Sequence, residues 1–380
     1  MLKNPKILYA SVSVIPGLAA NSVHVCKMAQ SFLNKGYENT FIGIRPHFFS
    51  SLDMSLLRRK YGLTRDIELI TFPRIRGLKM IYYLYQIKKF VKKYNPDLIY
   101  TRSIFLAYKL LNLNKKIVFE CHDRLTEEEL DKFKTVCNSE NLIKIVLISG
   151  ALKTLFQDEY KISADRIVVA HDGVDIERFA NPLCPADARK ELDLPEKFTV
   201  TYSGHLYDGR GIDVIFELAK IYSDVNFIIV GGREEHIQSH KETMKKIGLT
   251  NMVFIGYVDN SSVPGYLFAA DVLLMPYQEK VRSSGNTGNI SEWMSPLKMF
   301  EYMAASRGII SSDLPVLHEV LNDKNCQFCP PADYDAWSKA LARYIEDPVL
   351  RTAHGKQAYE DVADYTWDKR VENIMSAIQL

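Results

Sequence analysis

The segment SEWMSPLKMFEYMAASRGIISSDLP, residues 291–315, has residue types and spacings that could bind an anion. Ser295 is a preferred N-cap residue and Pro296 a preferred first helical residue, so we expect a helix to begin here. The free N–H groups of that helix and the side chain of Lys298 would together attract an anion. Glu301 follows about one turn later, where its carboxylate could accept hydrogen bonds from two vicinal hydroxyls, as on a ribose, or could simply compensate the helix dipole.

A second segment, VTYSGHLYDGRGIDVIFELAK at residues 200–220, combines a predicted strand, a loop and a helix. The strand ends near Gly204, His205 follows it, and Arg210 stands between two glycines. Backbone N–H groups and the guanidinium could hold a phosphate in such a loop. Gly-Arg-Gly turns are common, so this segment alone is weak support.

Strands and helices alternate along the whole chain and must position these residues. Apolar runs predict strands at 7–12, 39–44, 68–72, 97–101, 116–120, 143–148, 167–170, 199–204, 226–231, 252–256, 272–275, 308–311 and 326–329. Helical patterns lie at 21–35, 78–94, 103–113, 125–136, 150–159, 210–222, 234–247, 261–269, 296–305, 333–346 and 348–363. Nearly continuous apolar strands indicate parallel sheets with helices on both faces.

A polar, Pro-rich stretch at 179–198 interrupts this alternation and is the best linker candidate. We therefore predict an α/β protein with two Rossmann-like, doubly wound domains, 1–180 and 181–365. A C-terminal helix at 366–380 is expected to return to the first domain. Because ligands of such sheets bind outside the carboxyl ends of the strands, a cleft between the two domains is the expected site.

Composition and charge narrow the function classes. With 47% apolar and 25% charged residues, the chain is typical of a globular protein and unlike a collagen or a disordered chain. A net charge of +2 argues against nucleic acid as a partner bound through overall charge. Residues 1–180 nevertheless hold 28 Lys and Arg against 18 Asp and Glu. This basic half indicates an anionic partner, such as a membrane surface or an anionic substrate, or else a solvated face.

The N-terminal run ILYASVSVIPGLAA imitates a short signal peptide. Ser11, Ser13 and Pro16 interrupt its apolar core, so we favour a buried first strand and a cytoplasmic protein, with peripheral attachment to the inner face of the membrane as an extension. The sequence contains no run of 18 apolar residues, so we predict no membrane-spanning helix. Cys326 and Cys329 form a CxxC without a second ligand pair, so a short strand is favoured over a metal site.

Taken together, SGHLYDGRGID and SPLKMFEYMAASRGIISSDLP resemble the retaining nucleotide-sugar glycosyltransferases of glycosyltransferase family 4, which have the GT-B fold. The weaker motifs follow in the family's order over almost the whole chain: NPDLIYTR, IVFECHD, VVAHDGVDIERF, NFIIVGG, NMVFIGYVD, FAADVLLMPY and YTWDKRVENIM. The resemblance implies that the first domain binds the acceptor and the second binds the nucleotide sugar. It also implies that neither a metal nor another cofactor is needed.

The resemblance also implies roles for residues of the second domain. His205 and Arg210 match the family's Arg and Lys at the donor diphosphate, and Gly204 begins their loop. Glu301 matches the second glutamate of the family's E-x7-E pair, which binds the ribose hydroxyls. The base would lie near Tyr257, and UDP is favoured on family frequency alone.

This segment departs from the family pattern in two ways. The first glutamate of the E-x7-E pair falls at Trp293, so Ser295 or Glu292 would have to replace it. The usual Gly-Phe-Gly turn is replaced by residues 294–296. Because proline has no N–H, the expected backbone donors to the donor diphosphate are those of Leu297, Lys298 and Met299.

In the first domain, only Gly17 of IPGLAANS matches the family's Gly-rich loop. His122 of ECHD matches the histidine that faces the reacting sugar, and the alternative is a purely structural hydrogen bond. Asp172 stands where the family has Asn, in a turn that we expect only to connect the domains.

These assignments lead to a mechanism. Arg210, Lys298 and, if it is protonated, His205 would stabilise the departing diphosphate together with the helix N-terminus. Attack of the acceptor on the front face of the sugar, assisted by the leaving phosphate oxygen, needs no protein nucleophile. The acceptor would be a glycan or a lipid-linked sugar, which the basic first domain would suit.

Three other interpretations remain open at the level of sequence. A nucleotide-sugar epimerase would share the diphosphate site but would need acid and base carboxylates. A catalytically idle partner subunit is suggested by the missing first glutamate. A nicotinamide dehydrogenase fits the alternation but lacks a GxGxxG after the first strand.

Overall fold

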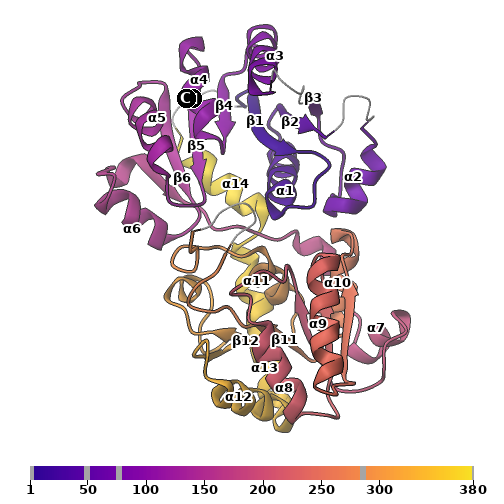
Figure 1. The fold of residues 1–380 in the computed structure, drawn as a ribbon. Coiled ribbons are helices and arrows are strands. Elements are labelled where there is room, and N and C mark those ends of the chain that lie inside the picture. The colour runs from indigo at the N-terminus through magenta and orange to yellow at the C-terminus, as the bar shows by residue number, and fades with distance from the viewer. Residues whose placement is uncertain (1–3, 47–51, 74–78, 283–287, 379–380) are drawn as a thin grey trace. The chain divides into compact units, whose positions relative to one another are not determined.

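Figure 1 shows the computed structural model, in which the chain folds into two compact α/β units, each built on a parallel sheet. It describes residues 4–46, 52–73, 79–282 and 288–378. The first unit comprises Met1–Asp172 and Trp367–Leu380, and the second comprises Gly173–Thr366. The boundary therefore lies before Gly173 instead of after residue 180, and residues 173–180 belong to the second unit.

The first unit contains a seven-stranded sheet in the order β3-β2-β1-β4-β5-β6-β7. Its strands are β1 (Ile7–Val14), β2 (Asn39–Arg45), β3 (Leu69–Pro73), β4 (Leu98–Thr101), β5 (Lys116–Cys121), β6 (Leu142–Leu147) and β7 (Ile167–Val169). β1 lies inside the sheet, pairs with β2 and β4, and is fully buried over residues 7–10. The N-terminal apolar run is therefore a core strand, as predicted.

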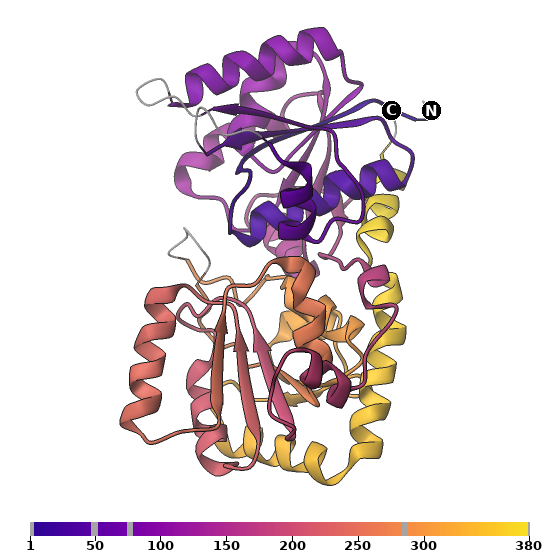
Figure 2. The ribbon, with the colours of Figure 1, turned by 90° about the vertical axis from the view of Figure 1, so that its right-hand side faces the viewer.

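Helices cover both faces of this sheet, with α1 and α3 on opposite sides (Figure 2). The helices are α1 (Ala20–Asn34), α2 (Met54–Tyr61), α3 (Lys79–Tyr94), α4 (Ile104–Leu110), α5 (Glu127–Cys137), α6 (Gly150–Asp158) and α14 (Trp367–Ser376). The sequence did not predict α2, a short helix whose N-terminus is capped by the Asp53 carboxylate and which ends at Gly62 in the left-handed conformation.

The C-terminal helix α14 belongs to the first unit and packs against α1. The Asn373 side chain donates to the carbonyl oxygen of Val169 at 3.0 Å. On the surface, Lys35 and Glu372 form an ion pair at 2.6 Å. Contacts at both the strand end and the helix surface hold α14 in place.

The second unit contains a six-stranded sheet in the order β10-β9-β8-β11-β12-β13. Its strands are β8 (Thr199–Ser203), β9 (Asn226–Val230), β10 (Met252–Gly256), β11 (Val272–Met275), β12 (Gly308–Ser312) and β13 (Gln327–Cys329). Its helices are α7 (Pro185–Glu191), α8 (Ile212–Ile221), α9 (Glu234–Lys246), α10 (Val263–Phe268), α11 (Leu297–Ala304), α12 (Tyr334–Glu346) and α13 (Pro348–Asp361). Short 3-10 turns in the two units lie at 111–113, 164–166, 176–179, 260–262, 315–319 and 362–364.

The core of the second unit forms where α8 and α12 pack on the sheet. Phe227, Ile229, Trp337 and Leu341 are among its fully buried side chains. Burying each side chain of this size contributes about 1.5–3 kcal/mol. This core fixes the ends of β8 and β11, next to which the predicted binding residues lie.

The CxxC pair belongs to the same interior. Cys329 ends β13, and both Cys326 and Cys329 are buried. Burial raises the pKa of the Cys329 thiol to about 12, so it remains protonated at neutral pH. The strand interpretation of this segment is confirmed.

Within the described ranges, no helix combines the length and the apolar character needed to cross a bilayer.

Candidate active site

Helix α11 begins one residue later than the sequence predicts. Pro296 is its N-cap, with extended backbone angles, and Leu297 is its first helical residue. Ser295 is buried ahead of the cap, so the prediction that it caps the helix is wrong: the Pro296 carbonyl oxygen accepts from the N–H of Met299 at 2.9 Å. Because the Met299 N–H is engaged, the amides of Leu297 and Lys298 are the better donors to an anion.

The Lys298 side chain is buried beside the first turn of α11. It is 9% exposed, and its Nζ has no hydrogen-bond partner among the described residues. Nζ lies 3.8 Å from the ring centroid of Tyr202 and 5.2 Å from that of Tyr277. Burial, and then the charge of Arg210, holds the pKa of Lys298 well below its usual range. An amine in this position gains an electrostatic partner when an anion binds next to it.

Gly204 makes room for that amine at the end of β8. Its φ of +139° lies in a region that residues with side chains avoid. A Cβ atom at this position would lie 2.8 Å from Nζ of Lys298. The backbone conformation therefore requires glycine here, and the close approach of the Lys298 amine adds to this preference.

The Gly-Arg-Gly turn places Arg210 next to the same tyrosines. Gly209 and Gly211 have φ of +81° and +74°, and a Cβ on Gly211 would overlap the carbonyl group of Pro276. The turn thus packs directly on the segment that follows β11. The Arg210 guanidinium lies 5.2 Å from the centroid of Tyr277, so the rings of this site carry two cationic side chains.

His205 follows Gly204 and stacks on Tyr207 with ring centroids 4.9 Å apart. Burial, followed by the charges of Arg210 and Lys298, lowers the pKa of His205 to about 4. The ring is therefore neutral at pH 7 in the ligand-free site, so the charge that the sequence analysis made conditional on protonation of His205 is absent there. A bound diphosphate would raise this pKa, because an adjacent anion favours the charged ring.

Glu301 is held by two residues that the sequence analysis did not identify. Its Oε1 accepts from Nδ2 of Asn260 at 3.1 Å, and Oδ1 of Asn260 accepts from Arg178 at 2.8 Å. Arg178 lies in the VVAHDGVDIERF motif, so its position in an ordered motif was the available signal. The Glu301 carboxylate is thereby fixed one turn into α11.

The structure places the remaining candidates of this unit as follows. Trp293 is buried and Glu292 is exposed, so the residue at the family's first glutamate position is an apolar core side chain. Tyr257 follows β10 and is 49% exposed.

The contacts described above bring four of the predicted residues together in one cluster: Gly204, His205, Arg210 and Lys298. We call it the cationic cluster.

Gly17 of the first unit has a packing role. Its N–H donates to the Tyr61 hydroxyl at 2.7 Å, and that hydroxyl donates to the Gly17 carbonyl oxygen at 3.2 Å. A Cβ on Gly17 would lie 2.8 Å from Oγ of Ser22. Its backbone groups are engaged within the protein, so the structure offers no support for the predicted ligand contact.

His122 lies immediately after β5, next to a buried carboxylate. Its Nε2 contacts Oε1 of Glu120, which is 0% exposed. Burial, followed by the charge of Arg102, lowers the pKa of His122 to about 3, although Glu120 acts in the opposite direction. The ring is therefore a neutral imidazole at pH 7, partly exposed and hydrogen-bonded to one oxygen.

Glu120 remains ionised because Arg370 and two imidazole rings surround it. Burial alone would raise its pKa, but Arg370, His24 and His122 together hold the pKa well below its usual range. Nη2 of Arg370, on α14, lies 3.1 Å from Oε1. The Tyr100 hydroxyl donates to Oε2.

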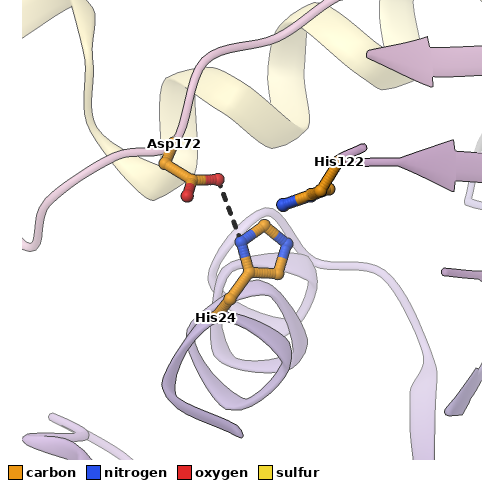
Figure 3. Close-up of side chains that lie close together, drawn as sticks. All are labelled: His24, His122 and Asp172. Atoms are coloured by element: carbon orange, nitrogen blue, oxygen red, sulfur yellow. Dashed lines mark ion pairs between the residues drawn. The ribbon is translucent and has the colours of Figure 1, made fainter. Parts of the chain in front are cut away.

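His24 joins Glu120 to Asp172, as Figure 3 shows for the Asp172 side. Its Nδ1 lies 3.0 Å from Oδ1 of Asp172, and its Nε2 lies 2.8 Å from Oε1 of Glu120. Burial would raise the pKa of Asp172, but its interaction with His24, followed by those with His122 and Arg370, lowers the pKa to about 2. The sequence analysis had expected the turn at Asp172 only to connect the domains. Asp172 is instead part of a buried ion-pair network.

His24, His122 and Asp172 also have ligand atoms within 4.8 Å of one another. Two imidazoles and a carboxylate could ligate zinc or iron. A cation here would break the His24–Asp172 ion pair and would lie near Arg370, whose charge affects both carboxylates. Arg370 already supplies positive charge to both carboxylates, so these residues fit a metal poorly.

The sequence analysis identified His122 in this network and missed the residues around it. Glu120 is two residues away in the same motif, but a glutamate in an apolar strand is not by itself a functional signal. Arg370 is 250 residues from Glu120 in sequence, and only the fold brings the two together.

The two units therefore offer complementary chemistry. The cationic cluster, with the first amides of α11, is suited to bind and stabilise a diphosphate. Glu301 can accept hydroxyl hydrogen bonds beside it. The His122 network provides a neutral imidazole held by a carboxylate.

Comparison with known proteins agrees with this chemistry. The family model described as Glycosyltransferase Family 4 matches residues 22–178, and the model described as Glycosyl transferases group 1 matches residues 197–347. The processive diacylglycerol alpha-glucosyltransferase of Acholeplasma laidlawii is 21% identical over 250 residues, which are 65% of this chain and 70% of that enzyme. Several other curated relatives are matched over less than two thirds of their length.

Solved structures share the fold over nearly the whole chain. Anabaena HepE in complex with UDP superposes with a TM-score of 0.74 at 16% identity, over 98% of this chain and 100% of HepE. Sucrose-phosphate synthase of Thermosynechococcus elongatus superposes with a TM-score of 0.76 at 16% identity, over 98% of each chain. The two family models, the curated relatives and the shared fold together show that this chain belongs to the GT-B glycosyltransferases.

Proposed function

We propose that this glycosyltransferase transfers a hexosyl or N-acetylhexosaminyl group from a nucleoside-diphosphate sugar, with UDP as the favoured nucleotide, and retains the anomeric configuration. The acceptor is a glycan or a lipid-linked sugar of a cell-surface polysaccharide or glycoconjugate. The complexes of HepE with UDP and with UDP-glucose support the choice of donor. The first unit binds the acceptor and the second binds the donor.

The buried amine of Lys298 is the observation that carries this proposal. An amine without a hydrogen-bond partner among the described residues, 3.8 Å from a tyrosine ring centroid and next to Arg210, is costly unless an anion binds there. In the reaction, negative charge develops on the departing diphosphate, and Lys298, Arg210 and the first amides of α11 would stabilise it.

We further propose that the reaction is independent of metal. Arg210, Lys298 and the helix N-terminus provide the positive charge that a divalent cation provides in other enzymes whose leaving group is a phosphate. His205 adds a third positive charge once the bound diphosphate raises its pKa. Transfer that proceeds unchanged in EDTA would support this proposal, and activity that requires added Mg²⁺ or Mn²⁺ would contradict it.

The acceptor proposal includes attachment to the inner, anionic face of a membrane. Helix α3 exposes Ile81 and Tyr85, at 73% and 61%, and carries Lys89, Lys92 and Lys93 on its exposed surface. Each basic residue near an anionic surface contributes about 1 kcal/mol. The protein should sediment with anionic vesicles at low salt and be released at high salt. Equal binding to neutral vesicles would contradict the charge argument.

The test of function is product analysis. The protein is incubated with UDP-glucose, UDP-galactose and UDP-N-acetylglucosamine and a panel of lipid-linked and free glycan acceptors. NMR then determines the anomeric configuration of any product, and retention is the expected result. An inverted product would refute the retaining mechanism, whereas an altered free sugar nucleotide formed without acceptor would indicate an epimerase.

A second candidate is a nucleotide-sugar-binding subunit without catalysis of its own. It is favoured by the buried Trp293 at the position of the family's first glutamate. This candidate predicts that UDP binds normally but that no acceptor gives a product. Restored turnover after addition of a partner protein would then distinguish it from an enzyme whose acceptor was not in the panel.

A further inference from the structure

Glu120 is a buried carboxylate that contacts several polar side chains. Both of its oxygens are engaged: Oε1 contacts His122, His24 and Arg370, and Oε2 accepts from Tyr100. A buried ionised carboxylate is stable only where such partners replace water. Two of its partners reach toward solvent: His122, whose side chain is 18% exposed, and Arg102, whose Nε lies 3.9 Å from Oε1 and whose side chain is 17% exposed.

The contact between Glu120 and His122 determines where the imidazole proton lies. A carboxylate only accepts hydrogen bonds, so the ring nitrogen that contacts it must carry a proton. That nitrogen is Nε2. A neutral imidazole has one N–H, which leaves Nδ1 unprotonated and able to accept a hydrogen bond.

We propose that Glu120 is a positioning residue that holds His122 in the Nε2–H tautomer and so keeps Nδ1 available to accept a hydrogen bond from a substrate hydroxyl. The role toward substrate rests on the proposed glycosyltransferase function; the tautomer does not. The carboxylate of a protease triad acts on its histidine in a comparable way, by fixing tautomer and orientation.

The C-terminal helix stabilises this arrangement. Arg370 of α14 directs Nη2 to Oε1 at 3.1 Å and Nη1 to Oε2 at 3.5 Å, and its Nε donates to the His171 carbonyl oxygen at 2.9 Å. Because Arg370 approaches both oxygens, the carboxylate is held in one orientation. The last helix of the chain thus supports the position of His122.

The first test is direct and requires no activity. Histidine is labelled with ¹⁵N in the full chain, and the spectra of wild type and His122→Asn identify the His122 signals among the nine histidines. At neutral pH we expect a protonated Nε2 and an unprotonated Nδ1. A protonated Nδ1, or a doubly protonated ring, would overturn the proposal.

The second test is kinetic and uses a variant that preserves charge balance. Glu120→Gln alone leaves Arg370 buried without its partner and is at risk of unfolding. The double variant Glu120→Gln with Arg370→Gln removes both charges together. We expect kcat to fall by about 10- to 100-fold, part of what acid–base groups contribute, while the Kd for UDP is unchanged. A folded double variant with wild-type kcat would overturn the proposal.

A matched control is Glu372→Gln, also on α14. Its ion pairs are with Lys35 and Lys369, which are partly or well exposed, so Glu372 belongs to a surface cluster separate from the Glu120 network. The control should keep the wild-type kcat and His122 tautomer. If wild type transfers no sugar to any acceptor, the proposed function fails, and the NMR result still decides the tautomer of His122. If wild type is active and the NMR shows a protonated Nδ1, only the present inference fails.

Discussion

Replacement of Lys298 by methionine should change stability and ligand binding in opposite directions. Methionine has a similar length and lacks the amine, which lies 3.8 Å from the Tyr202 ring centroid and has no hydrogen-bond partner in the part of the chain that the structure describes. A buried polar group without a partner costs about 1–3 kcal/mol, and a cation–π contact returns about 1–2 kcal/mol. The variant should therefore gain about 1 kcal/mol in free energy of unfolding. For a unit of this size the gain corresponds to a rise in Tm of about 2–4 °C.

The same change should weaken nucleotide binding. A hydrogen bond to a charged group contributes about 1.5–3 kcal/mol, which corresponds to a Kd for UDP about 10- to 150-fold higher. Differential scanning fluorimetry without ligand and calorimetric titration with UDP measure the two effects. Lys246→Met, on the exposed surface of α9, is the control and should change neither quantity. A clear fall in Tm together with an unchanged Kd would refute the account of Lys298 as a strained anion ligand.

The pH dependence of the stabilisation has a definite sign. The pKa of Lys298 is lower in the folded protein than the ordinary lysine value of 10.5, so the unfolded chain binds more protons between those two values. Wild-type stability should therefore rise with pH through this window, because stability rises wherever the unfolded state binds more protons. The advantage of Lys298→Met should be largest at low pH and should disappear as pH approaches 10.5.

Three further predictions concern the same unit. UDP binding should take up protons, because the diphosphate raises the depressed pKa values of Lys298 and His205, and the affinity for UDP should therefore fall as pH rises. Calorimetric titrations in buffers of different ionisation enthalpy should reveal the proton uptake, and identical heats in those buffers would contradict it. His205→Arg should tighten UDP binding by about tenfold, as measured by calorimetry, since a fixed charge replaces a neutral ring; weaker binding would show that His205 is not near the diphosphate. Gly211→Ala should destabilise the second unit by about 1–3 kcal/mol in chemical denaturation, because its φ is +74° and a Cβ would overlap the Pro276 carbonyl; wild-type stability would contradict the described turn.

The alternation of buried strands and helices was visible in the sequence because parallel strands covered on both faces are nearly continuous apolar runs. For this reason β1, β8 and β11 were placed correctly. Helix α2 was missed because it is short and its start and end depend on Asp53 and Gly62 more than on an apolar pattern.

The candidate site was less predictable, because burial changes the chemistry of its residues. The sequence predicts Arg210, Lys298 and Glu301 as neighbours of one helix N-terminus and loop. It does not reveal that burial leaves His205 neutral, or that Pro296 caps α11 through its carbonyl group. These properties depend on contacts that form only when the unit folds.

The network around His122 depends on still longer connections. Glu120 and Arg370 are 250 residues apart and belong to different segments of the chain. A single sequence contains no signal that pairs them. Their partnership follows only from the return of α14 to the first unit.

The central claim is that the cationic cluster binds the diphosphate of a sugar nucleotide. The most direct measurement is the shift in Tm caused by UDP, GDP, ADP and CMP, each with and without EDTA, on wild type and on Arg210→Ala. A nucleotide at about 100 times its Kd adds about 2.7 kcal/mol to the free energy of unfolding, which is easily detected. The account predicts that a nucleoside diphosphate, UDP first, stabilises wild type equally in EDTA and does not stabilise Arg210→Ala. Absence of any shift in wild type, or an equal shift in Arg210→Ala, would contradict it.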